Sequence, residues 1–206
     1  MKLYYAPNTC SLASCIVAAE AGIALDLQKV DLRTRRTTSG ADYREVNPLG
    51  YVPALRLDDG RVLTEGVAIL QFLADCAPHA KLAPASGQFE RTHLQQWLTF
   101  VATELHKSFS PWLFHPAETG AQAQDYAKAR IRDRMTFLEN HLADNVYLLG
   151  GDFTVADAYC FTILGWSKFA GIELAAGSAL GRYFRRISAR PAVRSALQAH
   201  ENLKAA

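Results

Sequence analysis

The order of strand and helix patterns in the first ~80 residues constrains the fold more than any other feature of this chain. Residues 2–6, KLYYA, form a short apolar run that Pro7 ends, as expected of a buried strand. Apolar side chains then recur at helical spacing from Leu12 to Ile23, and residues 25–32, LDLQKVDL, alternate apolar with polar side chains. Strand, helix and strand at this spacing predict a βαβ unit with two parallel strands.

A hairpin pattern and a further helix pattern follow this unit. Within residues 52–66, two short apolar runs flank Asp59-Gly60, a dipeptide typical of tight hairpin turns. Apolar positions from Val67 to Leu73 then predict a helix. The order βαβ followed by ββα is that of a thioredoxin-like fold, so we expect an α/β thioredoxin-like domain over residues 1–80.

The rest of the chain carries helical patterns alone. Residues 76–87, CAPHAKLAPASG, have no periodicity and are typical of a linker. Beyond it we expect an all-helical domain over residues 87–206. Its predicted helices run along Leu94, Leu98, Val101 and Leu105, over 123–142, behind a capping box of Thr154 and Asp157, and over 183–197 with a break at Pro191.

Charge and cysteine content exclude several classes of protein. The 22 basic and 20 acidic residues leave a net charge of +2, too small to indicate binding to nucleic acid or to an anionic membrane. No run approaches the roughly 18 apolar residues that a membrane span needs. Cysteines at positions 10, 15, 76 and 160 show neither a Cys-x-x-Cys motif nor zinc spacing with histidine. We therefore expect no metal site, reduced thiols and a cytoplasmic location.

Cys10 stands between the first strand and the first helix. Free N–H groups at the start of a helix stabilise a thiolate there and lower its pKa below ~8.5. Ser11 adds a hydroxyl donor at the same place. A buried structural cysteine is an equally good interpretation of Cys10, because free cysteines are usually buried. For Cys15 and Cys160, inside apolar helical patterns, burial is the favoured interpretation.

Two short motifs near the hairpin suit a ligand with a peptide backbone and a carboxylate. If the Val52-Pro53 bond is cis, the Val52 backbone N–H and C=O face outward, although a trans proline at a sheet edge is the commoner case. Thr64, Glu65 and Gly66 open a helix whose N–H groups can bind a carboxylate. Glu65 either meets an ammonium group or only complements the helix dipole.

A polar stripe is predicted on the long helix. Thr99, Thr103 and His106 are spaced i, i+4, i+7, and Lys107 adjoins them. Such a stripe is usually a solvated face, but a histidine can donate a hydrogen bond or titrate near neutral pH. Together with the features around Cys10, it suits a small zwitterionic peptide that carries a thiol.

Five motifs, in order, resemble those of bacterial beta-class glutathione transferases. They are MKLYYAPNTCSLAS, VNPLGYVPAL, LTEGVAILQFLAD, ATELHKSFSP and FTVADAYCF, and the resemblance covers essentially the whole chain. It implies a thioredoxin-like domain followed by a helical domain, a homodimer, glutathione as co-substrate, and no metal or permanently bound cofactor.

The resemblance also implies roles for individual residues. Cys10 and His106 match catalytic positions, and Cys10 would contact the glutathione sulfur and form a mixed disulfide with it. Val52 would bond the cysteinyl backbone of glutathione, Glu65 and Gly66 its γ-glutamyl end, and Thr99 the glutathione of the other subunit. The full set of implied glutathione-binding residues is Cys10, Ser11, Arg35, Tyr51, Val52, Pro53, Glu65, Gly66, Thr99, Thr103, Glu104, His106 and Lys107. Arg35, Gly66 and Thr99 depart from the Lys, Ser and Asn that the family commonly has there.

The expected activity is conjugation of the glutathione thiolate to hydrophobic electrophiles, with dehalogenase or peroxidase activity also open. A monothiol glutathione-dependent disulfide reductase and a non-catalytic ligand-binding protein on the same fold are the alternatives. Aromatic residues that either pack in the core or line the electrophile pocket are Phe109, Trp112, Phe114 and Trp166.

Overall fold

The structure is a computed structural model that describes residues 1–113 and 117–202, without the side chains of residues 112, 201 and 202. Packing divides the chain into two compact units, which are described separately. The first combines Met1–Ala83 with the segment from Ala189 onward, and the second is Pro84–Ser188. This division differs from the expected 1–80 and 87–206, because the last helix of the chain packs with the first unit.

A five-stranded sheet forms the frame of the first unit, with strand order β3-β2-β1-β4-β5. The strands are β1 (Lys2–Tyr5), β2 (Asp26–Asp31), β3 (Arg36–Thr37), β4 (Ala54–Arg56) and β5 (Val62–Thr64). In the register, Leu3 of β1 lies opposite Leu27 of the parallel β2 and opposite Leu55 of the antiparallel β4. The predicted βαβ unit and hairpin are confirmed, whereas the two-residue β3 was not predicted, because so short a strand leaves no alternating pattern.

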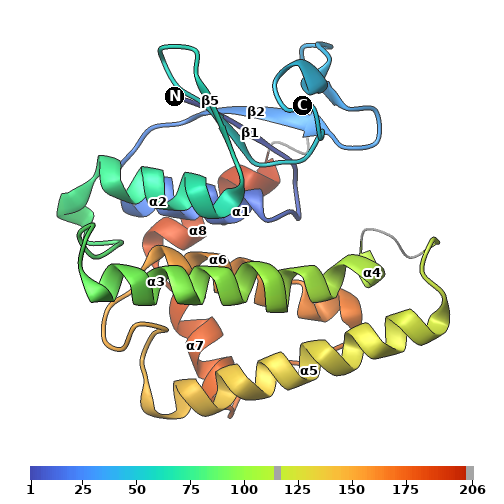
Figure 1. Ribbon diagram of the computed structural model, residues 1–206, viewed down its shortest axis with the longest axis vertical. Coiled ribbons are helices and arrows are strands. Elements are labelled where there is room, and N and C mark those ends of the chain that lie inside the picture. Colours follow the sequence, from blue (N-terminus) through green and yellow to red (C-terminus); the bar gives the residue numbers. More distant parts are fainter. Residues whose placement is uncertain (114–116, 203–206) are drawn as a thin grey trace. The chain divides into compact units, whose positions relative to one another are not determined.

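Three helices pack in this unit: α1 (Ser11–Glu20), α2 (Gly66–Cys76) and α8 (Pro191–Asn202). In Figure 1, α1 and α2 run side by side along one face of the sheet, and α8 packs against α1. Leu3, Ile16, Leu55 and Leu70 are buried between sheet and helices. The thioredoxin-like prediction for this unit is confirmed.

The described part of the second unit is helical, apart from an isolated bridge between Tyr147 and Gly150. Its helices are α3 (Phe89–Phe100), α4 (Ser110–Leu113), α5 (Ala121–Asp144), α6 (Val155–Leu164) and α7 (Ala179–Ser188), with α3 in green and α5 in yellow in Figure 1. A π-helical turn, Val101–His106, continues α3, and a 3₁₀ turn, Lys107–Phe109, leads into α4. Every residue of α6 is buried, so this helix is the core of the unit. Among the described residues, none of the helices is long and apolar enough to cross a membrane.

Asp157, in the first turn of α6, links this helix to Leu148, to Thr154 and to Tyr183 of α7. Its Oδ2 accepts hydrogen bonds from the Thr154 N–H and hydroxyl, both at 2.9 Å, which confirms the predicted capping box. Its Oδ1 accepts from the Leu148 N–H at 2.9 Å and from the Tyr183 hydroxyl at 3.0 Å. Burial raises the pKa of the Asp157 carboxyl to about 6, against the opposing effect of these four donors.

Candidate active site

Cys10 lies at the N-cap position of α1, directly before Ser11. The side chain is half-buried, and its Sγ donates to the Val52 carbonyl oxygen across 3.5 Å. It is therefore not a core cysteine. The buried interpretation holds instead for Cys15, whose pKa is raised to about 12 by burial, and for Cys160, whose pKa burial also raises.

The turn before Cys10 is held by hydroxyl groups. The Thr9 hydroxyl donates to the Ala6 carbonyl at 2.7 Å and lies 2.7 Å from the Ser11 hydroxyl oxygen. Ser11 is fully buried, and its N–H donates to Thr9 Oγ1 at 3.3 Å. The hydroxyl and the N–H of Ser11 therefore serve the turn that supports Cys10, and a contact of Ser11 with glutathione stays a prediction.

The loop beside Cys10 carries a cis peptide bond between Val52 and Pro53, which is the rarer of the two alternatives that the sequence left open. The Tyr43 hydroxyl and the Asn47 amide nitrogen fix this loop by donating to the Tyr51 carbonyl, at 2.7 and 2.8 Å. The Tyr51 ring itself is exposed. The loop therefore presents Tyr51 and the Val52 backbone close to Sγ of Cys10.

Arg35 joins the same loop from the β2–β3 connection. Its Nη1 donates to the Gly50 carbonyl at 2.6 Å, and its guanidinium carbon lies 6.0 Å from the centre of the Tyr51 ring. Gly50 has φ of +67°, and a Cβ there would come within 3.0 Å of Arg35 Cδ. Glycine at position 50 thus makes room for Arg35 as well as for the turn.

Glu65 and Gly66 lie at the start of α2. Glu65 is the N-cap residue in an unusual conformation, φ 65° and ψ 113°, and its exposed side chain does not cap the helix. Gly66 packs beside the cis proline, since a Cβ on it would lie 3.8 Å from Pro53 Cγ. A helix end without a side-chain cap keeps N–H groups available for an anionic ligand, and the predicted binding of a carboxylate there stays a prediction.

In the second unit, His106 lies in an aromatic setting. Its Nδ1 is 2.6 Å from the Tyr159 hydroxyl, and its ring meets the rings of Tyr159 and Trp166 edge-on, with centroids 5.8 and 4.9 Å away. Burial, assisted by the Lys107 ammonium, lowers the pKa of His106 to about 4. At neutral pH the imidazole is therefore uncharged and can take part in hydrogen bonds, rather than titrate near pH 7.

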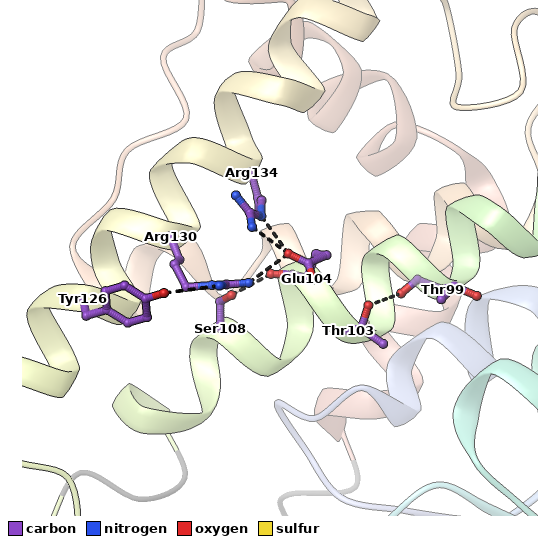
Figure 2. A network of polar contacts seen from close by, with 7 residues as sticks. All are labelled: Thr99, Thr103, Glu104, Ser108, Tyr126, Arg130 and Arg134. Carbon is purple, nitrogen blue, oxygen red and sulfur yellow. Dashed lines mark hydrogen bonds and ion pairs between the residues drawn. The ribbon is translucent and has the colours of Figure 1, made fainter.

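The prediction that His106 shares a polar helix face with Thr99 and Thr103 is wrong. Thr99 and Thr103 are exposed, and Figure 2 shows the Thr103 hydroxyl donating to the Thr99 carbonyl, at 3.0 Å. His106 instead turns toward Tyr159. The π-helical turn explains the difference, because i→i+5 bonding winds the chain more slowly than an α-helix and rotates the later residues.

Glu104 is paired within its own chain. Figure 2 shows its Oε2 accepting from Arg130 Nη2 at 2.9 Å and from Arg134 Nε and Nη2 at 2.9 and 2.7 Å. The Arg134 side chain lowers the pKa of the Glu104 carboxyl. The pairing of Glu104 with Arg130 and Arg134 was not predicted from the sequence. Lys107 is exposed nearby in the chain.

The four aromatic pocket candidates are placed only in part. Phe109 and Trp166 are buried with ring centroids 5.9 Å apart, which is core packing. Phe114 and the side chain of Trp112 lie outside the described residues.

Comparisons with known proteins identify the family of this chain. The glutathione S-transferase N-terminal domain family matches residues 9–76, and the C-terminal domain family matches residues 100–191. Glutathione S-transferase GstA of Escherichia coli O157:H7 is 42% identical over 99% of this chain and 100% of its own length.

Solved structures give the same result. A ternary complex of BphK, a bacterial glutathione transferase, is 50% identical with a TM-score of 0.93, covering 97% of this chain and 99% of its own. Two further structures are each 44% identical with a TM-score of 0.93. A sphingomonad glutathione S-transferase complexed with glutathione covers 97% of this chain and 98% of its own. The bacterial beta-class enzyme of Sphingomonas chungbukensis covers 98% and 99%. The chain therefore belongs to the glutathione S-transferase family, among its bacterial beta-class members.

Proposed function

We propose that this glutathione transferase holds glutathione on the face of its first unit that carries Cys10, Val52 and Glu65, and transfers the glutathione thiolate to a hydrophobic electrophile. The observation that carries the proposal is the position of Cys10: its Sγ lies at a helix N-terminus and 3.5 Å from the carbonyl that precedes the cis proline. The sphingomonad relative complexed with glutathione supports the choice of ligand.

Each charged part of glutathione has a complementary group on this face. The Val52 backbone pairs with the cysteinyl residue of the ligand, and the N–H groups at the start of α2 take its γ-glutamyl carboxylate. Glu65 binds the ammonium group. The Arg35 guanidinium binds the second carboxylate as a planar two-donor group. These roles place the glutathione sulfur at the N-terminus of α1, close to Cys10.

The partial positive charge of that helix end favours the glutathione thiolate over the thiol. The thiolate attacks the electrophilic carbon of an aryl halide, a sulfur–carbon bond forms, and the halide leaves with the bonding electrons. The proton of the original thiol passes to solvent. In the second unit, neutral His106 can take part in a hydrogen bond, and His106, Thr103, Glu104 and Lys107 remain the residues that the family resemblance implies for glutathione. The same thiolate would dehalogenate a haloacid or reduce a hydroperoxide.

A second candidate function, monothiol disulfide reduction, is favoured by the half-exposed Cys10 thiol. Here the Cys10 thiolate attacks the glutathione sulfur of a glutathionylated peptide and releases the peptide thiolate. A free glutathione thiolate then attacks the resulting mixed disulfide, which yields oxidised glutathione and restores Cys10.

We further propose a homodimer in the cytoplasm. None of the four cysteines forms a disulfide in the structure, which suits a reducing compartment. Thr99 is exposed on α3, where it is available to reach the glutathione of the partner subunit. The dimer would be symmetric, with each active site receiving a small contribution from the other chain.

The test compares Cys10→Ala with wild type and with Cys76→Ser, which alters an exposed cysteine at the other end of α2 from Gly66. Glutathione-dependent turnover is measured on aryl halides, haloacids, hydroperoxides and a glutathionylated peptide. We expect conjugation that Cys10→Ala slows at least about tenfold, the effect of losing one group that stabilises the transition state, and that Cys76→Ser leaves within about twofold. Turnover of the glutathionylated peptide alone would select the reductase, and absence of glutathione binding by calorimetry would refute both functions.

A further inference from the structure

The buried end of α8 lies beneath the turn that carries Cys10. His200 is 3% exposed, and its Nε2 is 3.3 Å from the hydroxyl oxygen of Ser11, a residue 189 positions earlier in the chain. The ring of Tyr5, on β1, lies against the His200 ring with centroids 5.2 Å apart. The last described helix thus reaches the residue next to Cys10, within one compact unit.

The hydrogen-bond directions in the turn are assigned from the distances between the hydroxyl oxygens and their partners. Thr9 Oγ1 is 2.7 Å from the Ala6 carbonyl, which can only accept, so Thr9 donates its single proton there. Thr9 Oγ1 is also 2.7 Å from Ser11 Oγ, whereas the Ala6 carbonyl oxygen is 3.2 Å from Ser11 Oγ, so we assign the single Ser11 hydroxyl proton to the nearer Thr9 oxygen. The lone pairs of Ser11 then accept from the Ala6 N–H and from His200, both at 3.3 Å. With this assignment, His200 is the donor in its contact with Ser11 and carries its proton on Nε2.

The turn needs such support because its backbone is unusual. Asn8, between Ala6 and Cys10, has φ of +60°, in the left-handed region. Ser11 also follows Cys10 directly, so a shift of Ser11 moves the first turn of α1. Any rotation there changes how the helix N–H groups face Sγ of Cys10, and with it the stabilisation of a thiolate.

We infer that His200 is a positioning residue for Cys10: a chain of hydrogen bonds from His200 Nε2–H through Ser11 and Thr9 to the Ala6 carbonyl holds the turn that presents the thiol at the N-terminus of α1. The inference rests on the proposed function in one respect only, that Cys10 is the reactive thiol. It ties the reactivity of that thiol to the C-terminal helix.

The test measures the rate at which iodoacetamide alkylates Cys10 in wild type, His200→Leu and His200→Gln, by mass spectrometry at neutral pH. His200→Leu removes the donor, and we expect alkylation to slow about fivefold, the factor for one neutral hydrogen bond. His200→Gln keeps an N–H donor at similar reach and should stay within about twofold. Exposed Cys76 is the internal reference, and His79→Leu, an exposed histidine of the same unit, is the matched control. Glutathione is absent, so failure of the proposed function cannot produce either result.

Two further measurements distinguish a hydrogen-bond chain from simple core packing. Ser11→Ala combined with His200→Leu should be no slower than either single variant, because both interrupt one chain. Nitrogen NMR of wild type should show His200 as the Nε2–H tautomer. This measurement tests whether His200 donates to Ser11 even if His200→Leu does not fold. An Nδ1–H tautomer, alkylation of His200→Leu at the wild-type rate, or equal slowing by leucine and glutamine would overturn the inference.

Discussion

Asp157→Ala should destabilise the second unit strongly, because one side chain satisfies donors from three separate segments. The carboxylate accepts from the N–H groups of Leu148 and Thr154 and from the hydroxyls of Thr154 and Tyr183, and it is fully buried. Each buried donor left without an acceptor costs about 1–3 kcal/mol. The Thr154 hydroxyl can turn to another acceptor, so three donors remain and the expected loss is about 4 kcal/mol. That is a large part of the 5–15 kcal/mol typical of a domain.

The assay is urea unfolding at pH 7.5, where the carboxyl is ionised, followed by tryptophan fluorescence. Asp157→Asn is the matched variant: its oxygen can still accept from Leu148 and Tyr183, whereas its NH₂ faces the Thr154 N–H, so about half of the loss is expected. Thr154→Val should cost only about 1 kcal/mol. A loss below about 1 kcal/mol for Asp157→Ala, with an unchanged m-value, would show that these bonds do not hold the unit together.

Three further predictions concern the site. Glu65→Ala should weaken glutathione binding by about 1–3 kcal/mol in calorimetry, the contribution of a charged hydrogen bond; unchanged affinity would remove Glu65 from the site. The pKa of His106 is about 4 in the native state against an ordinary 6.5, so the unfolded state takes up the proton first, and stability falls by up to about 3 kcal/mol as pH drops from 6.5 to 4. His106→Gln should lack this part of the slope in urea titrations, and identical slopes would contradict the assignment. Light scattering should find a dimer of about 45 kDa, twice 22.7 kDa, while Thr99→Ala changes glutathione affinity by less than about 1 kcal/mol; a monomer that retains full binding would refute the shared site.

Features that depend on local chemistry were predictable from the sequence. The strand, turn and helix around Cys10 follow from apolar spacing and from Pro7, and the hairpin follows from Asp59-Gly60. The capping box of Thr154 and Asp157 needs only residues three apart. Each of these signals lies within a few residues of the element that it specifies.

Features that depend on contacts distant in the chain were not predictable. The pairing of Glu104 with Arg130 and Arg134 spans 26 and 30 residues, and the contact of His200 with Ser11 spans 189. The inward rotation of His106 results from a π-helical turn, for which apolar spacing gives no sign, since Leu98, Val101 and Leu105 fit an α-helix equally well. The periodicity of apolar residues indicates local helix or strand geometry, and it predicts neither long-range contacts nor the π-helical turn.

The backbone conformation of Glu65 implies a compromise between the thermal stability of the protein and the binding of its ligand. A residue with a side chain at φ 65° is held at a backbone angle that glycine adopts more readily, at a cost of order 1–3 kcal/mol. Glu65→Gly should therefore raise the melting temperature while removing the carboxylate proposed to bind the ligand. If variants of this protein were selected for heat resistance alone, without selection for activity, we would expect Glu65 to be replaced early.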